Sequence, residues 1–135
     1  MFYLFWQSIT KKYFQFSGRA NRKEYAIFLG IFFLLYHIFD TIEVTTEQSL
    51  LKTSLYLIIV IFLVFLTIPS ITITVRRLHD LNFCGWWFFL DIPIITVLYL
   101  INFPSVIITW SFSLILLLIK GTSGTNKYGE EPSYD

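Results

Sequence analysis

The sequence of 135 residues is poor in charge and contains a single cysteine, Cys84. One cysteine excludes a disulfide within the chain. Charged residues make up 14% of the sequence, whereas ordinary soluble domains contain roughly 25%. Hydrophobic residues reach 56%, and a soluble fold of this size has too small an interior to bury them all. The surplus of apolar side chains therefore predicts a protein that faces lipid.

Signatures of several other function classes are also missing. The net charge is only +1, which excludes a strongly basic nucleic-acid-binding protein, so we expect no nucleic-acid partner. The pair His79–Asp80 lacks the additional spaced ligands of a zinc site. The sequence contains neither a glycine-rich phosphate loop nor a recognisable serine or cysteine nucleophile motif. We therefore expect that the protein is not an enzyme and has no catalytic residue, cofactor or metal ion.

Long apolar runs predict an all-α membrane protein, with one membrane domain over residues 1–135 and about four transmembrane helices. The clearest run, 53–75, contains no charge and is long enough, at ~1.5 Å per residue, to cross a ~30 Å hydrocarbon core. The other membrane segments cover 24–42, 86–102 and 104–119. The last two fall short of the ~20 residues usual for a span. Two short spans are the first interpretation, and a re-entrant hairpin is the alternative.

Two flanking regions are too polar to span a membrane. Residues 1–17 carry aromatic side chains on one side of a helix and polar ones on the other, which predicts an amphipathic helix on the membrane surface. Residues 120–135 form a polar tail in which glycines indicate turns and in which Lys127 and Tyr128 are expected to fold back onto the lipid headgroups.

The distribution of basic residues predicts the orientation. Nine of the ten fall on the side of the two flanking regions and only Lys52 falls on the other. An excess of Lys and Arg marks the cytoplasmic side. We therefore expect a multi-pass protein of a bacterial inner membrane with both termini in the cytoplasm. The nine residues are Lys11, Lys12, Arg19, Arg22, Lys23, Arg76, Arg77, Lys120 and Lys127.

Two local signals refine the helices. Asn21, followed by Glu24 three positions later, resembles a capping box and predicts the start of the first membrane helix. Pro69 lies inside the 53–75 segment and predicts a kink near its cytoplasmic end.

Charged side chains at the cytoplasmic ends of the segments form the candidate site. Two interpretations stay open. In the first, the cluster serves packing and orientation, because Arg76 and Asp80 are four residues apart and can pair on one helix turn. In the second, it binds anionic lipid headgroups, a membrane-protein partner or another copy of the chain, since a basic residue near an anionic surface contributes about 1 kcal/mol. The candidate residues are Arg19, Arg22, Glu24, Arg76, Arg77, His79, Asp80 and Asp91.

Asp91 lies inside the predicted third segment. A carboxylate at the centre of a bilayer costs about 2.5–3.5 kcal/mol and less near the interface, so we expect Asp91 to have a partner, with Arg76 or Arg77 as candidates. An intramembrane carboxylate and the prolines Pro69 and Pro93 also suit a small transporter or channel.

Three motifs in chain order resemble those of the bacterial inner-membrane family called domain of unknown function 805, the YhaH-like proteins. The resemblance implies a multi-spanning bacterial inner-membrane protein and leaves its activity open. The motifs are residues 18–25 (GRANRKEY); residues 76–80 (RRLHD) with 85–87 (GWW) and Pro93; and residues 120–122 (KGT) with Gly124, residues 126–129 (NKYG) and Pro132.

The sequence thus favours a non-enzymatic membrane protein whose charged cluster binds a protein partner or lipid headgroups. A transporter or channel that uses Asp91 is one alternative. A membrane immunity or defence component is another, which only the small size of the chain supports.

Overall fold

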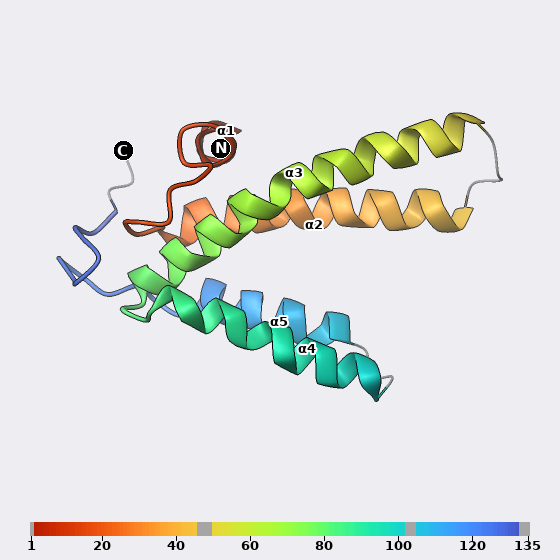
Figure 1. The fold of residues 1–135 in the computed structure, drawn as a ribbon. Helices are drawn as coiled ribbons and strands as arrows, with labels where there is room; N and C mark the ends of the chain where they lie inside the picture. Colours follow the sequence, from red (N-terminus) through yellow and green to blue (C-terminus); the bar gives the residue numbers. More distant parts are fainter. Residues whose placement is uncertain (1, 46–49, 102–104, 133–135) are drawn as a thin grey trace.

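The computed structural model describes residues 2–45, 50–101 and 105–132, and these are helical apart from turns and one isolated β-bridge. The all-α class is therefore confirmed. The helices form two hairpins, α2–α3 and α4–α5, with α1 beside the end of the first hairpin where both chain ends lie (Figure 1). The elements are α1 (Phe2–Ile9), α2 (Arg22–Thr45), α3 (Leu50–Asp80), the 3-10 helix η1 (Gly85–Leu90), α4 (Asp91–Leu100) and α5 (Ser105–Leu118).

The two hairpins differ in length. The 24 residues of α2 and the 31 of α3 span about 36 and 46 Å at ~1.5 Å per residue. The 10 residues of α4 and the 14 of α5 span only about 15 and 21 Å. Among the residues described, one stretch, Thr53–Asp80 within α3, has both the length and the apolarity of a membrane-crossing helix.

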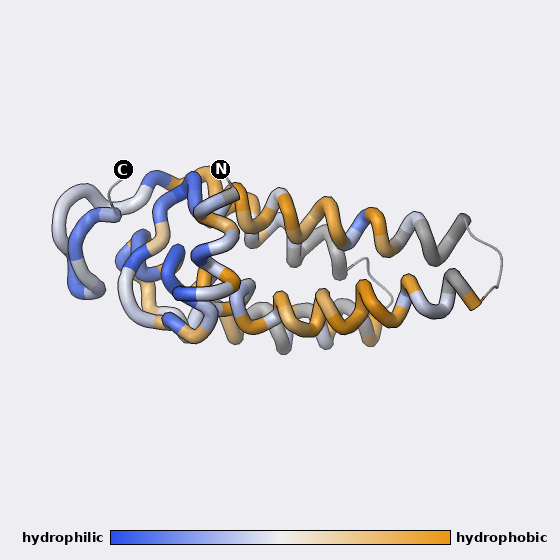
Figure 2. The backbone as a smooth tube through the Cα atoms, turned by 90° about the horizontal axis from the view of Figure 1, so that it is seen from above, coloured by the Kyte–Doolittle hydropathy of each residue, from blue (hydrophilic) through white to orange (hydrophobic). Residues whose placement is uncertain are grey.

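Polar and apolar residues are segregated along the helices. Hydrophilic residues gather at one end of the molecule, and hydrophobic ones follow the helices away from it (Figure 2). Along α3 the large apolar side chains of Ile58, Ile61 and Val64 are 63–69% exposed, and Leu118 at the end of α5 is 73% exposed. Such a surface is typical of helices in contact with lipid.

The buried core lies close to the hydrophilic end, where α2, α3 and α5 meet. We call this region, residues 18–25, 76–83 and 119–132, the polar end. The helices diverge away from it in Figure 1. Every residue of the core cluster belongs to the polar end or lies within three residues of it along the chain. The core cluster comprises Ala20, Tyr25, Phe28, Ile73, Leu78, Leu81 and Leu116.

The helix at the start of the chain is shorter than predicted. A helix over residues 1–17 is wrong, because α1 ends at Ile9. The chain then turns, so that the Tyr13 ring packs on Phe65 of α3 with centroids 4.9 Å apart, and its hydroxyl donates to the Phe65 carbonyl at 2.7 Å. These tertiary contacts override the helical spacing of the sequence.

Helix α3 continues past the predicted segment 53–75 and includes Arg76 and Arg77 before it ends at Asp80. It closes with a Schellman motif, in which the Phe83 N–H bonds to the Leu78 carbonyl at 2.9 Å and the Asn82 N–H bonds to the His79 carbonyl at 3.0 Å. Asn82 takes the left-handed conformation that this motif needs, with φ 64°.

The predicted third segment, 86–102, is not one α-helix. Its first part is the 3-10 helix η1, and α4 begins only at Asp91. Pro93 explains the break, because it has no N–H to donate and its ring would clash with the carbonyl four residues earlier, that of Phe89. Segment 104–119 agrees with α5, and segment 24–42 agrees with α2, which extends further at both ends. Residues 102–104, where the last two predicted segments meet, lie outside the described residues.

Candidate functional site

Seven of the eight predicted site residues gather at the polar end. Arg19, Glu24, Arg76, Arg77 and Asp80 are buried, and we call these five the polar cluster. Arg22 and His79 are partly exposed. Asp91 begins α4, but its side chain lies outside the described part of the structure, so its predicted pairing is not tested.

Glu24 joins α2 to α3. Its Oε1 accepts hydrogen bonds from Arg76 Nη1 at 2.9 Å and from Lys12 Nζ at 3.0 Å. The predicted Arg76–Asp80 pair is therefore wrong, because Arg76 reaches across to the first turn of α2 and Asp80 has other partners. The capping prediction is confirmed on one side, since the Glu24 N–H donates to Asn21 Oδ1 at 2.8 Å.

Asp80 pairs with two arginines. Arg19 approaches one of its oxygens, with Nη2–Oδ1 and Nε–Oδ1 distances of 2.9 and 3.0 Å. The other oxygen, Oδ2, accepts from Arg77 Nη1. The Asp80 carboxylate thus links the loop before α2 to the last turn of α3.

Arg77 also ties α3 to the end of α5. Its Nε donates to the Leu116 carbonyl at 2.9 Å, and its Nη2 donates to the Ile119 carbonyl at 2.5 Å. The last carbonyls of a helix have no partner within the helix, and a cation near them is stabilising. A single buried side chain therefore serves as ion-pair partner on α3 and as cap of α5.

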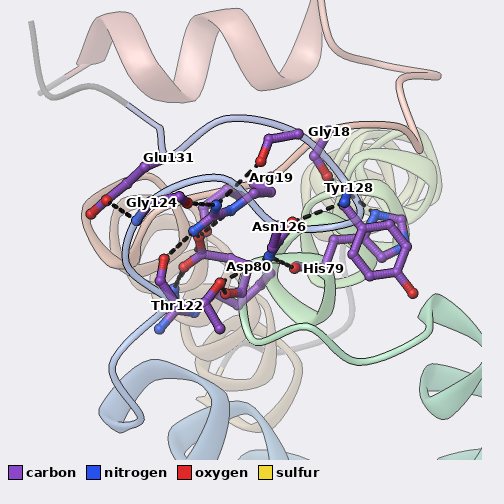
Figure 3. Close-up of polar contacts among 12 residues, drawn as sticks. Gly18, Arg19, His79, Asp80, Thr122, Gly124, Asn126, Tyr128 and Glu131 are labelled. Atoms are coloured by element: carbon purple, nitrogen blue, oxygen red, sulfur yellow. Dashed lines mark hydrogen bonds and ion pairs between the residues drawn. The ribbon is translucent and has the colours of Figure 1, made fainter.

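Arg19 holds the C-terminal tail. It donates to the carbonyl of Thr122 and, from Nη1, to the carbonyls of Gly124 at 2.5 Å and Gly129 at 3.3 Å (Figure 3). Gly124 and Gly129 have φ angles of 69° and 131°, which bulkier residues rarely adopt. The predicted turns at these glycines are confirmed, and they direct three carbonyl oxygens to one guanidinium group.

The tail also bonds directly to the end of α3. The N–H and hydroxyl of Thr122 both donate to the Asp80 carbonyl at 2.9 Å. Asn126 Nδ2 donates to the His79 carbonyl at 2.9 Å, and the Tyr128 ring stacks on the His79 ring with centroids 3.8 Å apart (Figure 3). His79 Nδ1 lies 3.1 Å from the Gly18 carbonyl. The sequence prediction missed these partners: it expected Tyr128 to face the headgroups, and the turn glycines were the only signal that the tail folds back.

Gly121 is fixed by close contact with the cluster. A Cβ atom added there would lie 2.0 Å from Asp80 Oδ2, far inside van der Waals contact. Glycine at this position lets the chain leave α5 and pass directly over the Asp80 carboxylate.

Buried ion pairs hold the polar cluster together. Three arginines against two carboxylates leave an excess of one positive charge, which the partly exposed Lys12 increases. Arg76 differs from the other two arginines, since its Nε and Nη2 find no hydrogen-bond partner among the described residues. Removing one partner of a buried ion pair typically costs about 3–5 kcal/mol, so the cluster is a structural centre of the polar end. Across the described residues, no group of three His, Cys, Asp or Glu side chains converges as metal ligands would.

Comparison with known proteins decides the family. Residues 13–130 match the family model described as "Protein of unknown function (DUF805)". The chain belongs to this family. The DUF805 match covers the whole polar cluster, since Arg19, Glu24 and the Arg76–Asp80 segment all fall within residues 13–130.

Three relatives in Escherichia coli K12 align over most of their length. The inner membrane protein YhaI is 32% identical over 127 residues, covering 94% of this chain and 93% of the relative. The inner membrane protein YhaH is 29% identical, with 94% of both chains covered. The uncharacterized protein YiiR is 27% identical, with 92% of this chain and 90% of the relative covered. No solved structure matches the chain significantly. The predicted family is confirmed, and two of these three relatives, YhaI and YhaH, are named inner membrane proteins.

Proposed function

We propose that this DUF805 protein is a multi-pass inner-membrane protein whose cytoplasmic polar end is a rigid, non-enzymatic binding platform for anionic lipid headgroups. The observation that carries the proposal is the polar cluster. It joins the loop before α2, the end of α3 and the tail, so basic side chains around it are presented on a fixed surface. A protein partner or a second copy of the chain is the alternative ligand of the same surface.

The apolar helices and the charges support the proposed orientation in the membrane. The apolar flanks of α3 and α5 are bare, and nine of the ten basic residues belong to the end where both termini lie. An excess of Lys and Arg on one side favours the cytoplasm for that side. Helix α1 leaves Tyr3 and Trp6 each 63% exposed, which suits a helix lying at the headgroup boundary.

The second hairpin supports two short spans. Counted together, six residues of η1 at ~2.0 Å and ten of α4 at ~1.5 Å extend about 27 Å, and α5 extends about 21 Å. We propose four membrane segments in which this hairpin is the shorter one. A re-entrant hairpin is the alternative.

The structure changes which side chains are available to a ligand. Arg19, Arg76 and Arg77 are buried, so we assign them to holding the platform. The exposed cations Lys11, Lys23, Lys120 and Lys127, with the partly exposed Arg22, are left to meet anionic headgroups. No contact among the described residues supports the two alternatives, transport through Asp91 and a role in immunity.

The test is native mass spectrometry of the full chain extracted from its own membrane in lipid nanodiscs. The proposal expects specifically retained anionic phospholipid, at a ratio above that in the surrounding membrane. A retained protein in place of lipid would favour the partner alternative. A chain that retains neither would overturn the binding function.

A further inference from the structure

A cavity opens at the polar end between the start of α2 and the chain that follows α5. Its volume is about 120 Å³, and Arg22, Arg77, Asp80, Lys120, Thr122 and Glu131 contribute to its walls. One water takes up ~30 Å³ of the liquid, so the cavity has room for several waters or one phosphate group.

The charged groups around this cavity differ in whether they already have a partner. Asp80 is paired with Arg19 and Arg77, and the Glu131 carboxylate accepts the Gly124 N–H at 2.6 Å. By contrast, neither Arg22 nor Lys120 forms an ion pair or a side-chain hydrogen bond with any described residue. Two cations therefore border the cavity with their donors unused.

The position of the two cations suits a phospholipid. Arg22 is the first residue of α2, and Lys120 comes two residues after α5 ends at Leu118. Both residues are thus where the chain passes from apolar helices to the polar end. In the proposed membrane orientation, this transition lies at the depth of the lipid phosphates. A guanidinium group binds phosphate through paired N–H donors and an ammonium group binds it as a point charge.

We infer that this cavity binds one phosphate group between Arg22 and Lys120, supplied by a phospholipid headgroup or by a soluble phosphate. The inference rests on the proposed function and assigns it to a defined pocket. Glu131 sets the charge that is accepted, because its carboxylate on the wall repels a second negative charge. The site therefore favours a singly charged phosphodiester over a doubly charged phosphate monoester.

The experiment uses the full chain in maltoside micelles, which contain no phosphate. Phosphatidylglycerol binding is followed by native mass spectrometry, and inorganic phosphate binding by calorimetry. The pocket variant Arg22→Gln/Lys120→Gln should lower the affinity for phosphatidylglycerol about tenfold or more, since each lost charge-assisted hydrogen bond is worth about that factor. The control Lys11→Gln/Lys127→Gln removes the same charge from cations outside the cavity and should lower the affinity for phosphatidylglycerol by a clearly smaller factor than the pocket variant does.

The variant Glu131→Gln keeps an acceptor for the Gly124 N–H and should bind phosphate more tightly. If the pocket variant loses only the binding of phosphatidylglycerol, the cavity is a site for lipid headgroups. If it loses the binding of inorganic phosphate as well, the site is open to soluble phosphates. Equal binding by the pocket variant and the unchanged chain, or equal weakening by the control, overturns the pocket while the proposed function stands. No binding by the unchanged chain overturns both.

Discussion

Arg19 and Asp80 lie 61 residues apart in the sequence, and their side chains form a buried ion pair with an Nη2–Oδ1 distance of 2.9 Å. The same guanidinium group binds three carbonyl oxygens of the tail, and the same carboxylate binds Arg77. One contact therefore connects the loop before α2, the end of α3 and the tail.

Replacing Asp80 by Asn should destabilise the protein by about 3–5 kcal/mol, because two buried arginines lose their counter-charge. The free energy of unfolding in mixed micelles, measured by titration with sodium dodecyl sulfate, checks this value. Glu130→Gln is the matched control, since it removes an exposed carboxylate from the tail. An Asp80→Asn protein as stable as the control would contradict the structural role of the cluster.

A double-mutant cycle distinguishes the observed partner of Arg76 from the one that spacing suggested. Glu24→Gln and Arg76→Gln should show a coupling energy of about 0.5–3 kcal/mol, as contacting residues do. The cycle of Arg76→Gln with Asp80→Asn should give a smaller coupling, because these side chains bind other partners. A larger coupling for Arg76 with Asp80 would show that the helix-turn pair forms instead.

Gly121→Ala should destabilise the polar end by about 1–3 kcal/mol, the usual cost of overpacking. The reason is the Cβ atom, which would lie 2.0 Å from Asp80 Oδ2. Gly30→Ala is the control, since nothing lies within 4 Å of a Cβ added there and alanine favours the helix. Thermal unfolding followed by circular dichroism compares the two, and equal stability would contradict the close passage of the tail over Asp80.

Cys84, the only cysteine, is exposed and directly follows the residues of the polar end that close α3. If this end is cytoplasmic, a membrane-impermeant maleimide should label Cys84 in inverted vesicles and leave it unlabelled in intact spheroplasts. In the control chain Cys84→Ser/Lys52→Cys, the cysteine precedes the 53–75 segment, and the pattern should reverse. Labelling of Cys84 in spheroplasts would place the polar end on the periplasmic side.

The sequence was sufficient for the helices that lipid and local signals determine. The charge-free run 53–75 and the Asn21 cap predicted α3 and the start of α2, because apolar length and capping act over a few residues. Contacts between distant residues could not be predicted in this way. Tyr13 lies outside α1 and packs on Phe65. Arg76 pairs with Glu24 and not with Asp80, which is closer to it in the sequence.

The candidate site shows the same division. Residue type and position were enough to gather Arg19, Arg77 and Asp80 at one end of the bundle. Their burial, and the use of their donors by the carbonyls of Thr122 and Gly124, depend on how the tail folds. No spacing rule links residue 19 to residues 122–129, so the contacts of Arg19 with the tail could not be predicted from the sequence.

Hydrogen–deuterium exchange of the tail amides tests the Arg19–Asp80 connection most directly. In the unchanged chain, the Thr122 N–H bonds to the Asp80 carbonyl and the Asn126 N–H to the Gly129 carbonyl, so both should exchange slowly. Arg19→Gln should speed their exchange, whereas the exposed-site control Lys11→Gln should not. Tail amides that already exchange in the unchanged chain as fast as those of an unstructured peptide would contradict a tail fixed over the end of α3.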